Sequence, residues 1–167
     1  MSPTHALRNP PVNRVRRALA LAPVAAAGLT LWSRKVSAAT LPTPASLADE
    51  LAAALRAGRP LIVMASLHGC PFCRTVRDSY LAPLRAEQGQ PVVQVDMDSK
   101  QLMRDFTGAQ TTHERMLRDW RVSVAPTVLF FGTQGREVAK RLTGASIPDF
   151  YGAYLEERLR EARKRLG

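Results

Sequence analysis

The segment LIVMASLHGCPFC, residues 61–73, holds the strongest structural signals in this chain of 167 residues. Its first part belongs to a continuous apolar run, Pro60 to Ala65. A short run of this kind predicts a β-strand that is buried on both faces. Two cysteines follow almost at once, at the start of a stretch with helical character. The segment therefore predicts a buried strand, a short loop and a helix whose first turn contains both cysteines.

Cys70 and Cys73 are the only cysteines in the chain, and two residues separate them. A disulfide that closes so small a ring removes little entropy from the unfolded chain. The pair is therefore better explained by chemistry than by stabilisation. At a helix N-terminus, Cys70 would lie beside unpaired N–H groups and the positive end of the helix dipole, which favour its thiolate.

The residues next to Cys70 fit the same interpretation. Pro71 suits the first helical turn, because the N–H that it lacks would have no intrahelical partner there. Cys73 follows one turn later, close enough for a disulfide and more covered. We predict that Cys70 is the catalytic nucleophile that attacks a substrate disulfide, and that Cys73 resolves the mixed disulfide.

Haem and metal sites fit these residues less well. A c-type haem attachment needs His directly after the second cysteine, and Arg74 stands there. Zinc needs about four ligands, and the mature chain offers only the two cysteines, His68 and His113. We therefore expect no metal site and no cofactor.

Residues 1–39 carry the pattern of an export signal. A basic segment, Arg14 to Arg17, precedes an apolar segment, Ala18 to Trp32. The small residues Ser37-Ala38-Ala39 then offer a cleavage site before Thr40. We predict that the signal is cleaved and that the protein lies in a bacterial periplasm, where a disulfide can persist.

Two alternatives about this signal stay open. Arg16 and Arg17 resemble a twin-arginine signal, but they also fit an ordinary basic segment, so the export route is not determined. The signal could also be retained as a membrane anchor. Its apolar part has about fifteen residues, fewer than the roughly twenty that span a bilayer, which favours cleavage.

The net charge of +10 does not by itself indicate a nucleic-acid partner. Residues 1–39 contain six basic residues and no acidic one, and without them the chain has 18 basic and 14 acidic residues. Much of this smaller surplus lies in the predicted C-terminal helix, where an exposed face with local ion pairs accounts for it. We expect no nucleic-acid partner.

The remainder divides into a proline-bearing linker, residues 40–45, and one domain, residues 46–167. The patterns predict the following elements in order: a helix from Ser46 to Gly58, the strand Pro60–Ala65, a helix from Cys70 to Glu87 with a kink near Pro83, the strand Pro91–Val95, helices at Ser99–Phe106 and Thr112–Trp120, the strand Thr127–Phe131, a turn at Gly132–Gly135, the strand Glu137–Leu142 and a helix from Ser146 to about Leu166. This order predicts an α/β fold with a central mixed sheet of about four strands, flanked by helices.

Several details of these elements can also be predicted. Thr111 and Glu114 have the spacing of a capping box before the helix at 112–120. His113, near the start of that helix, is expected to be solvated. Large aromatic side chains are expected in the core, at Trp120, Phe130 and Phe131.

Landmarks in this order resemble the thioredoxin superfamily from about Ser46 to Leu159. They are Leu61-Ile62-Val63 leading into Cys70-Pro71-Phe72-Cys73, then Val93-Gln94-Val95-Asp96, then Val122-Ser123-Val124-Ala125-Pro126-Thr127, then Gly135 with Glu137-Val138, and Gly144. The resemblance implies a thioredoxin-like fold and a thiol–disulfide oxidoreductase. The stretch between Asp96 and Pro126 is longer than in minimal thioredoxins. It is similar to exported bacterial thioredoxin-like proteins, which carry an extra helical segment there.

The resemblance also implies where substrates bind. It implies a cis peptide bond before Pro126. The ring of this proline would pack beside the active disulfide and keep metal from the thiols. Ala125 would offer its backbone to an extended substrate strand. Together with Pro71 and Phe72, these residues form the implied substrate-binding set. The implied partners are cysteine-containing protein substrates and a membrane or soluble redox partner.

The chain departs from the thioredoxin pattern at two positions. Thioredoxins and related oxidants place a buried acid six residues before the first cysteine, and Met64 stands there. The nearest titratable group to Cys70 is His68, which we assign as a candidate acid–base residue, with a plain loop histidine as the alternative. Gly69 replaces the tryptophan that thioredoxins carry before the first cysteine, which opens the surface there.

We therefore predict an enzyme that exchanges thiols and disulfides with protein cysteines outside the cytoplasm. Oxidants and reductants share this motif, so the direction of electron flow stays open. The alternative is a thioredoxin-fold binding or chaperone-like module, or a metal carrier, without turnover.

Overall fold

A four-stranded sheet forms the centre of the computed structural model, which describes residues 40–145 and 148–166. Its strands are β1 (Leu61–Ser66), β2 (Val92–Asp96), β5 (Thr127–Phe131) and β6 (Glu137–Thr143), in the spatial order β2-β1-β5-β6. β1 pairs with β2 in parallel and with β5 antiparallel, and β5 and β6 are antiparallel neighbours. The predicted mixed sheet of about four strands is confirmed. The predicted export signal, residues 1–39, lies outside the described residues.

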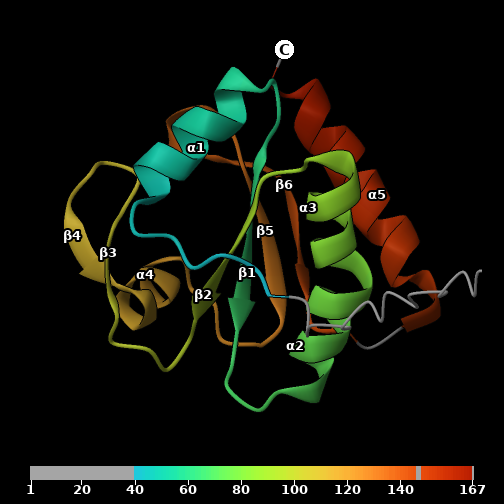
Figure 1. Ribbon diagram of the computed structural model, residues 1–167, viewed down its shortest axis with the longest axis horizontal. Coiled ribbons are helices and arrows are strands. Elements are labelled where there is room, and N and C mark those ends of the chain that lie inside the picture. The colour runs from blue at the N-terminus through green and yellow to red at the C-terminus, as the bar shows by residue number, and fades with distance from the viewer. Residues whose placement is uncertain (1–39, 146–147, 167) are drawn as a thin grey trace, which may run out of the picture. The chain divides into compact units, whose positions relative to one another are not determined.

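Helices cover both faces of this sheet (Figure 1). One face packs against α1 (Leu47–Arg56) and α4 (His113–Asp119). The other face packs against α2 (Pro71–Val76), a π-helical turn η1 (Arg77–Leu81), α3 (Ala82–Gln88) and α5 (Pro148–Lys164). The predicted start of the last helix at Ser146 lies outside the described residues. No helix in the described part of the chain is both long and apolar enough to cross a membrane.

β1 is buried along its whole length, as the apolar run predicted. Its side chains alternate between the two faces, as successive strand residues must. Ile62 and Met64 join the core under α2 and α5, whereas Val63 and Ala65 join the core under α1 and α4. The strand therefore holds the two halves of the core together and fixes the position at which α2 begins.

The helices begin and bend for local reasons. Ser46 caps α1 as predicted, because its hydroxyl accepts a hydrogen bond from the Asp49 N–H at 3.2 Å. The predicted helix from Cys70 to Glu87 is present as the continuous series α2, η1 and α3. Pro83 lies in the first turn of α3, directly after the π turn. A proline removes one intrahelical donor, and the π turn lies directly before that position, where a kink was predicted.

The prediction of a helix at Ser99–Phe106 is wrong. The structure has a hairpin of β3 (Leu102–Arg104) and β4 (Gln110–Thr112) in that region. The turn between them is organised by Asp105, whose Oδ1 accepts hydrogen bonds from the N–H and hydroxyl of Thr107 and from the Ala109 N–H. An Asp side chain that bonds to following backbone groups competes with helix formation, so the hairpin forms instead.

The start of α4 also corrects two predictions. The N-cap is Thr112, whose hydroxyl accepts from the Arg115 N–H at 3.2 Å, and not the predicted Thr111. His113, expected to be solvated, is fully buried. The reason is that the β3–β4 hairpin, absent from the predicted elements, places the first turn of α4 against the end of β2.

Residues 40–45, predicted to be a linker, lie along the domain in the structure. Leu41 is buried in the core under α2 and α5. The Pro42 carbonyl accepts a hydrogen bond from the Gln94 N–H, and the Ala45 carbonyl accepts one from the Arg104 N–H. This segment therefore adds contacts to the outer edge of β2 and to the hairpin.

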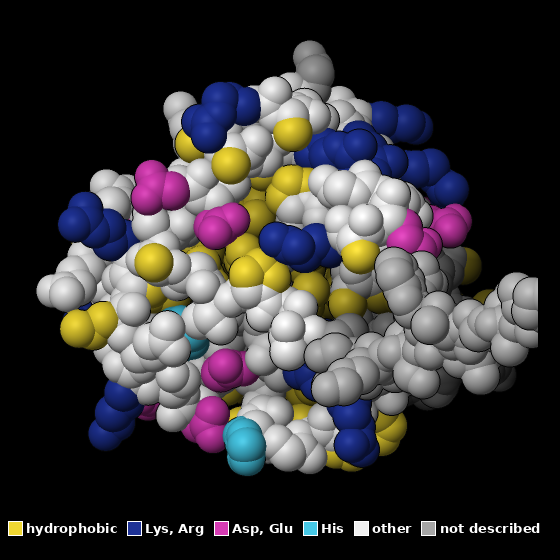
Figure 2. Space-filling view, viewed as in Figure 1, with side chains coloured by type: hydrophobic (Ala, Val, Ile, Leu, Met, Phe, Trp, Pro, Cys, Tyr) yellow, Lys and Arg dark blue, Asp and Glu magenta, His cyan; other side chains and the backbone are white. Residues whose placement is uncertain are grey.

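The aromatic core and the charged helix largely follow the predictions. Phe130 and Phe131 are buried, whereas Trp120 is half-buried and lies against Phe106 and Phe131. Lys and Arg side chains gather near the C-terminal end of α5 (Figure 2). Glu161 pairs there with Arg158 and Arg165, at 3.3 and 2.8 Å, which confirms the predicted local ion pairs.

Candidate active site

The two cysteines lie at the junction of β1 and α2. Cys70 is the N-cap residue of α2, with an extended backbone, and its sulfur accepts a hydrogen bond from the Cys73 N–H at 3.1 Å. Gly69, with a φ of +71°, turns the chain from the end of β1 into this cap. Pro71 occupies the first turn of α2, as predicted. The sulfur of Cys70 therefore lies among the free N–H groups of the helix terminus.

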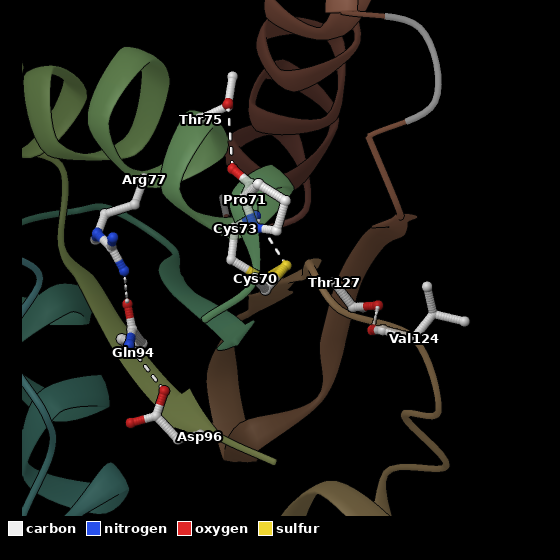
Figure 3. The surroundings of a disulfide bond; sticks show 9 residues. All are labelled: Cys70, Pro71, Cys73, Thr75, Arg77, Gln94, Asp96, Val124 and Thr127. Atoms are coloured by element: carbon white, nitrogen blue, oxygen red, sulfur yellow. Dashed lines mark hydrogen bonds between the residues drawn. A yellow bond between two sulfur atoms is a disulfide. The ribbon is translucent and has the colours of Figure 1, made fainter. Parts of the chain in front are cut away.

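Cys70 and Cys73 form a disulfide, and their Cα atoms are 5.2 Å apart (Figure 3). The two cysteines differ in access to solvent. Cys70 is half-buried, whereas Cys73 is 1 % exposed and packs in the core under α2 and α5. The difference in exposure fits the predicted roles. A partner in solution can reach the sulfur of Cys70, whereas the buried sulfur of Cys73 can reach only that of Cys70.

The loop before β5 lies beside this disulfide. The peptide bond between Ala125 and Pro126 is cis, as the resemblance implied. Pro126 is buried, and Ala125 packs against the same core cluster as Cys70 and Cys73. The Thr127 hydroxyl donates to the Val124 carbonyl at 2.7 Å, which closes the loop upon the start of β5 (Figure 3).

Exposed apolar side chains surround the disulfide. Leu67 and Phe72 lie within three residues of Cys70, and Val124 precedes the Ala125–Pro126 platform. These are three of the six large apolar side chains that are exposed among the described residues. We call Leu67, Phe72 and Val124 the apolar rim. An apolar surface at a reactive sulfur is typical of a site that docks another protein.

A polar cleft of about 630 Å³ opens beside the disulfide and shares Leu67 with the apolar rim. In Figure 3 its residues Gln94 and Asp96 lie across the disulfide from Val124 and Thr127. Arg77 donates to the Gln94 side-chain oxygen at 3.3 Å, and the Gln94 side-chain nitrogen donates to Asp96 Oδ1 at 2.8 Å. The cleft is lined by Ser66, Leu67, His68, Gly69, Cys70, Cys73, Arg74, Arg77, Gln94, Asp96, Asp98 and Ser99.

The two histidines of this region differ from each other. His68 is exposed on the loop after β1 and lines the polar cleft, and its assigned acid–base role stays a prediction. His113 is buried, and its Nδ1 accepts a hydrogen bond from the Asp96 N–H at 3.2 Å. Burial lowers the pKa of His113, and the nearby Asp96 carboxylate opposes that shift in part. The imidazole is therefore a neutral acceptor that anchors the end of β2.

Sequence reasoning did not identify Gln94, Asp96 or the anchoring role of His113. A signal was available for the first two. They lie two residues apart on a strand, so their side chains must share one face of the sheet, together with Val92. No comparable signal marked His113, because its environment depends on the hairpin. Among residues 40–145 and 148–166, no group of three or more His, Cys, Asp or Glu residues is placed to hold a metal ion.

Comparisons with known proteins agree with this architecture. The family model of a thioredoxin-like domain matches residues 47–158. The structure is similar to Fasciola hepatica thioredoxin, with a TM-score of 0.50 and 21 % identity over 73 % of this chain and 99 % of that chain. It is also similar to a thioredoxin from Thermus thermophilus, with a TM-score of 0.50 and 23 % identity over 77 % of this chain and 92 % of that chain. No curated protein matches the chain in sequence. At these identities the structural likeness shows a shared fold.

The buried imidazole makes the stability of the protein depend on pH. Burial keeps the pKa of His113 in the folded state below the ordinary histidine value of 6.5, so the unfolded chain binds the proton first. The stability that the neutral imidazole contributes is present above about pH 6.5 and is lost as the pH falls toward the folded-state pKa. We expect the free energy of unfolding in urea to fall between about pH 7.5 and 5.5, and to fall less in His113→Gln.

The Gln side chain keeps an oxygen that can accept the Asp96 N–H but does not titrate. His68→Gln is the matched control, because it makes the same exchange at an exposed loop position. We expect this control to keep the pH dependence of the parent protein. Equal pH dependence in the parent and His113→Gln would contradict the assignment of His113 as the titrating group.

Proposed function

The chain belongs to the thioredoxin-like family, and from that premise we propose that it is an exported thiol–disulfide oxidoreductase acting on protein cysteines. The observation that carries the proposal is the pairing of a half-buried Cys70 at the N-cap of α2 with a buried Cys73. A thioredoxin-like fold with a C-x-x-C pair joined as a disulfide supports a redox enzyme of this class in general.

The exchange proceeds in two steps. In the reduced protein, the Cys70 thiolate attacks one sulfur of a substrate disulfide, and the other substrate sulfur leaves as a thiolate. Cys73, deprotonated, then attacks the sulfur of Cys70. The Cys70–Cys73 bond forms, and the second substrate sulfur leaves with the electron pair. The substrate is reduced by two electrons and the protein is oxidised by two, and the same steps in reverse oxidise a dithiol substrate.

Protein substrates suit the surface around Cys70. The apolar rim offers Leu67, Phe72 and Val124 to the apolar side chains of a partner. The Ala125–Pro126 segment lies beside the disulfide, where the backbone of Ala125 can pair with an extended substrate strand. Pro71 and Phe72, which directly follow Cys70 in the sequence, are exposed as well. A second protein, soluble or in a membrane, would then restore the redox state of the pair.

We assign this reaction to the periplasm because of the first 39 residues. They combine a basic segment, an apolar segment and a small-residue cleavage site. Compartments outside the cytoplasm allow a disulfide such as Cys70–Cys73 to persist between reactions. The described domain begins packing at Leu41, just after the expected cleavage site, so cleavage there would leave its core complete.

The roles of the two cysteines can be tested by replacing each of them. We expect the parent protein to accelerate the reduction of insulin by dithiothreitol. Cys70→Ser should lower the rate to that of dithiothreitol alone, because no nucleophile remains at the surface. Cys73→Ser should instead accumulate mixed disulfides with substrate proteins, detected on non-reducing gels, because the first step proceeds and the second cannot. Trapping by Cys70→Ser and not by Cys73→Ser would reverse the assigned roles.

The apolar rim can be tested with a pair of exposed phenylalanines. Phe72 is 58 % exposed beside Cys70, and Phe150 is 59 % exposed on α5, outside the apolar rim. Burying a phenylalanine against a partner contributes about 1.5 to 3 kcal/mol, so we expect Phe72→Ser to raise the KM for a protein substrate about tenfold or more. Phe150→Ser should leave the KM unchanged. Equal KM values for both variants would show that substrates do not dock on the rim.

Export can be tested by sequencing the N-terminus of the protein recovered from an extracytoplasmic fraction. We expect the mature chain to begin near Ala39 or Thr40, because the small-residue site precedes Thr40. A soluble cytosolic protein that retains Met1 would contradict both export and cleavage. A protein that retains Met1 in the membrane fraction would indicate the anchored form.

A further inference from the structure

Cys73 lies where its thiol is hard to ionise. Its side chain is 1 % exposed and belongs to the apolar cluster that contains Met64 and Val76. Burial in apolar surroundings disfavours a thiolate, because the charged form loses its hydration. Since Cys73 must become a thiolate to resolve a mixed disulfide, its proton needs an acceptor that can be reached from the sulfur.

The polar cleft supplies the route to this sulfur. Cys73 lines the cleft, and β2 forms part of its wall through Gln94 and Asp96. Gln94 is paired with Met64, and Asp96 with Ser66, in the parallel register of β1 and β2. Residues paired in this way point to the same face, so both polar side chains extend to the face that α2 covers (Figure 3). The volume of about 630 Å³ exceeds the roughly 30 Å³ of one water many times, so the cleft can hold a chain of waters.

Asp96 is a fixed acceptor within this cleft. It is half-buried, and the side chain of Gln94 donates to its Oδ1 at 2.8 Å. Arg77, from η1, orients Gln94 by donating to its oxygen. His113, from α4, accepts the backbone N–H of Asp96. The carboxylate therefore has Gln94 as its direct partner, and Arg77 and His113 hold that partner and the Asp96 backbone at the wall of the cleft.

The other titratable groups of the cleft are less suited to accept this proton. Asp98 and His68 are exposed on loops, with no contact that would hold them toward Cys73. Arg74 and Arg77 are donors and have no acceptor atom. Ser66 lies on β1 opposite Asp96 and carries a hydroxyl, which can relay a proton but is a poor base.

We propose that Asp96 accepts the proton of Cys73, through water in the cleft, when Cys73 resolves the mixed disulfide; this inference rests on the proposed function. The S–H bond of Cys73 breaks, and its proton passes through water to the Asp96 carboxylate, which becomes neutral. The Cys73 thiolate attacks the Cys70 sulfur, the Cys70–Cys73 bond forms, and the substrate sulfur leaves as a thiolate. Asp96 then releases the proton to solvent. Asp96 is thus a positioning and proton-accepting residue that acts without touching the substrate.

The test separates the two steps with a neutral small disulfide, 2,2′-dithiodipyridine, added in equal amount to the reduced protein. Attack by Cys70 releases one thiopyridone, and resolution by Cys73 releases the second, so the two rates appear as successive absorbance changes. Cys73→Ser should show the first release only. We expect Asp96→Asn to leave the first rate unchanged and to slow the second about a hundredfold near pH 6, the lower end of the range for proton-transfer catalysis. The difference should shrink as the pH rises above about 8.5, the pKa of a free thiol, because hydroxide then removes the proton of the buried thiol without help.

Matched variants distinguish this role from a structural one. Asp96→Asn keeps an oxygen for Gln94, and Asp96→Ser, which also lacks the carboxylate, provides a second variant if Asn does not fold. Asp96→Glu should restore the second rate at pH 6, because it restores a carboxylate. Asp98→Asn, at another position of the cleft, should show the rates of the parent protein.

Two results would overturn the inference while leaving the proposed function intact. One is a second release in Asp96→Asn with the rate and pH profile of the parent. The other is equal slowing by Asp98→Asn. Absence of the first release from the parent protein is a different result, because it would show that Cys70 is not a nucleophile and would overturn the proposed function together with this inference.

Discussion

The hydrogen bond from the Cys73 N–H to the Cys70 sulfur marks the constraint on which the rest of the site depends. It exists because β1 ends at Ser66 and α2 begins at Pro71, with only the short loop at residues 67–69 and the N-cap Cys70 between them. The turn at Gly69 then places a sulfur atom where a helix leaves its first N–H groups without partners. Because of this junction between β1 and α2, Cys70 is accessible to solvent and Cys73 lies in the core. The substrate platform and the polar cleft are both arranged around it.

The features that the sequence predicted are those with local causes. The buried strand, the helix cap at Ser46 and the position of Cys70 each depend on residues within about one turn or one strand. The wrong predictions share the opposite property. Residues 99–106 contain apolar residues at spacings that a helix would tolerate, but the hydrogen bonds that Asp105 makes to its own turn favour a hairpin. The exposure of His113 was wrong for a related reason, since its burial depends on that hairpin and on the end of β2.

The candidate site divides in the same way. The reactive pair and its order of access follow from the motif and its position at a helix N-terminus, so the sequence was sufficient to propose them. The cis peptide bond before Pro126 was predicted only because the resemblance implied it. The polar wall of the cleft was not predicted, because its members come from β1, α2, η1 and β2, and the parallel register of β1 and β2 aligns the strand residues among them. The pairing of segments that are distant in the chain is the feature that is hardest to predict from a single sequence.

The surface around the disulfide has an apolar and a polar part that meet at Leu67, whereas Met64 lies inside the core. A carboxylate in place of Met64 would be buried among apolar side chains, where ionised groups are costly unless they are paired. At Asp96 the carboxylate is only half-buried and accepts a hydrogen bond from Gln94, so a carboxylate there destabilises the folded protein less than one at position 64 would. The apolar rim can then exclude water from the docked substrate while protons move through the cleft. An arrangement of this kind keeps the packing of β1 entirely apolar up to Ser66 and still leaves Cys73 within reach of a base.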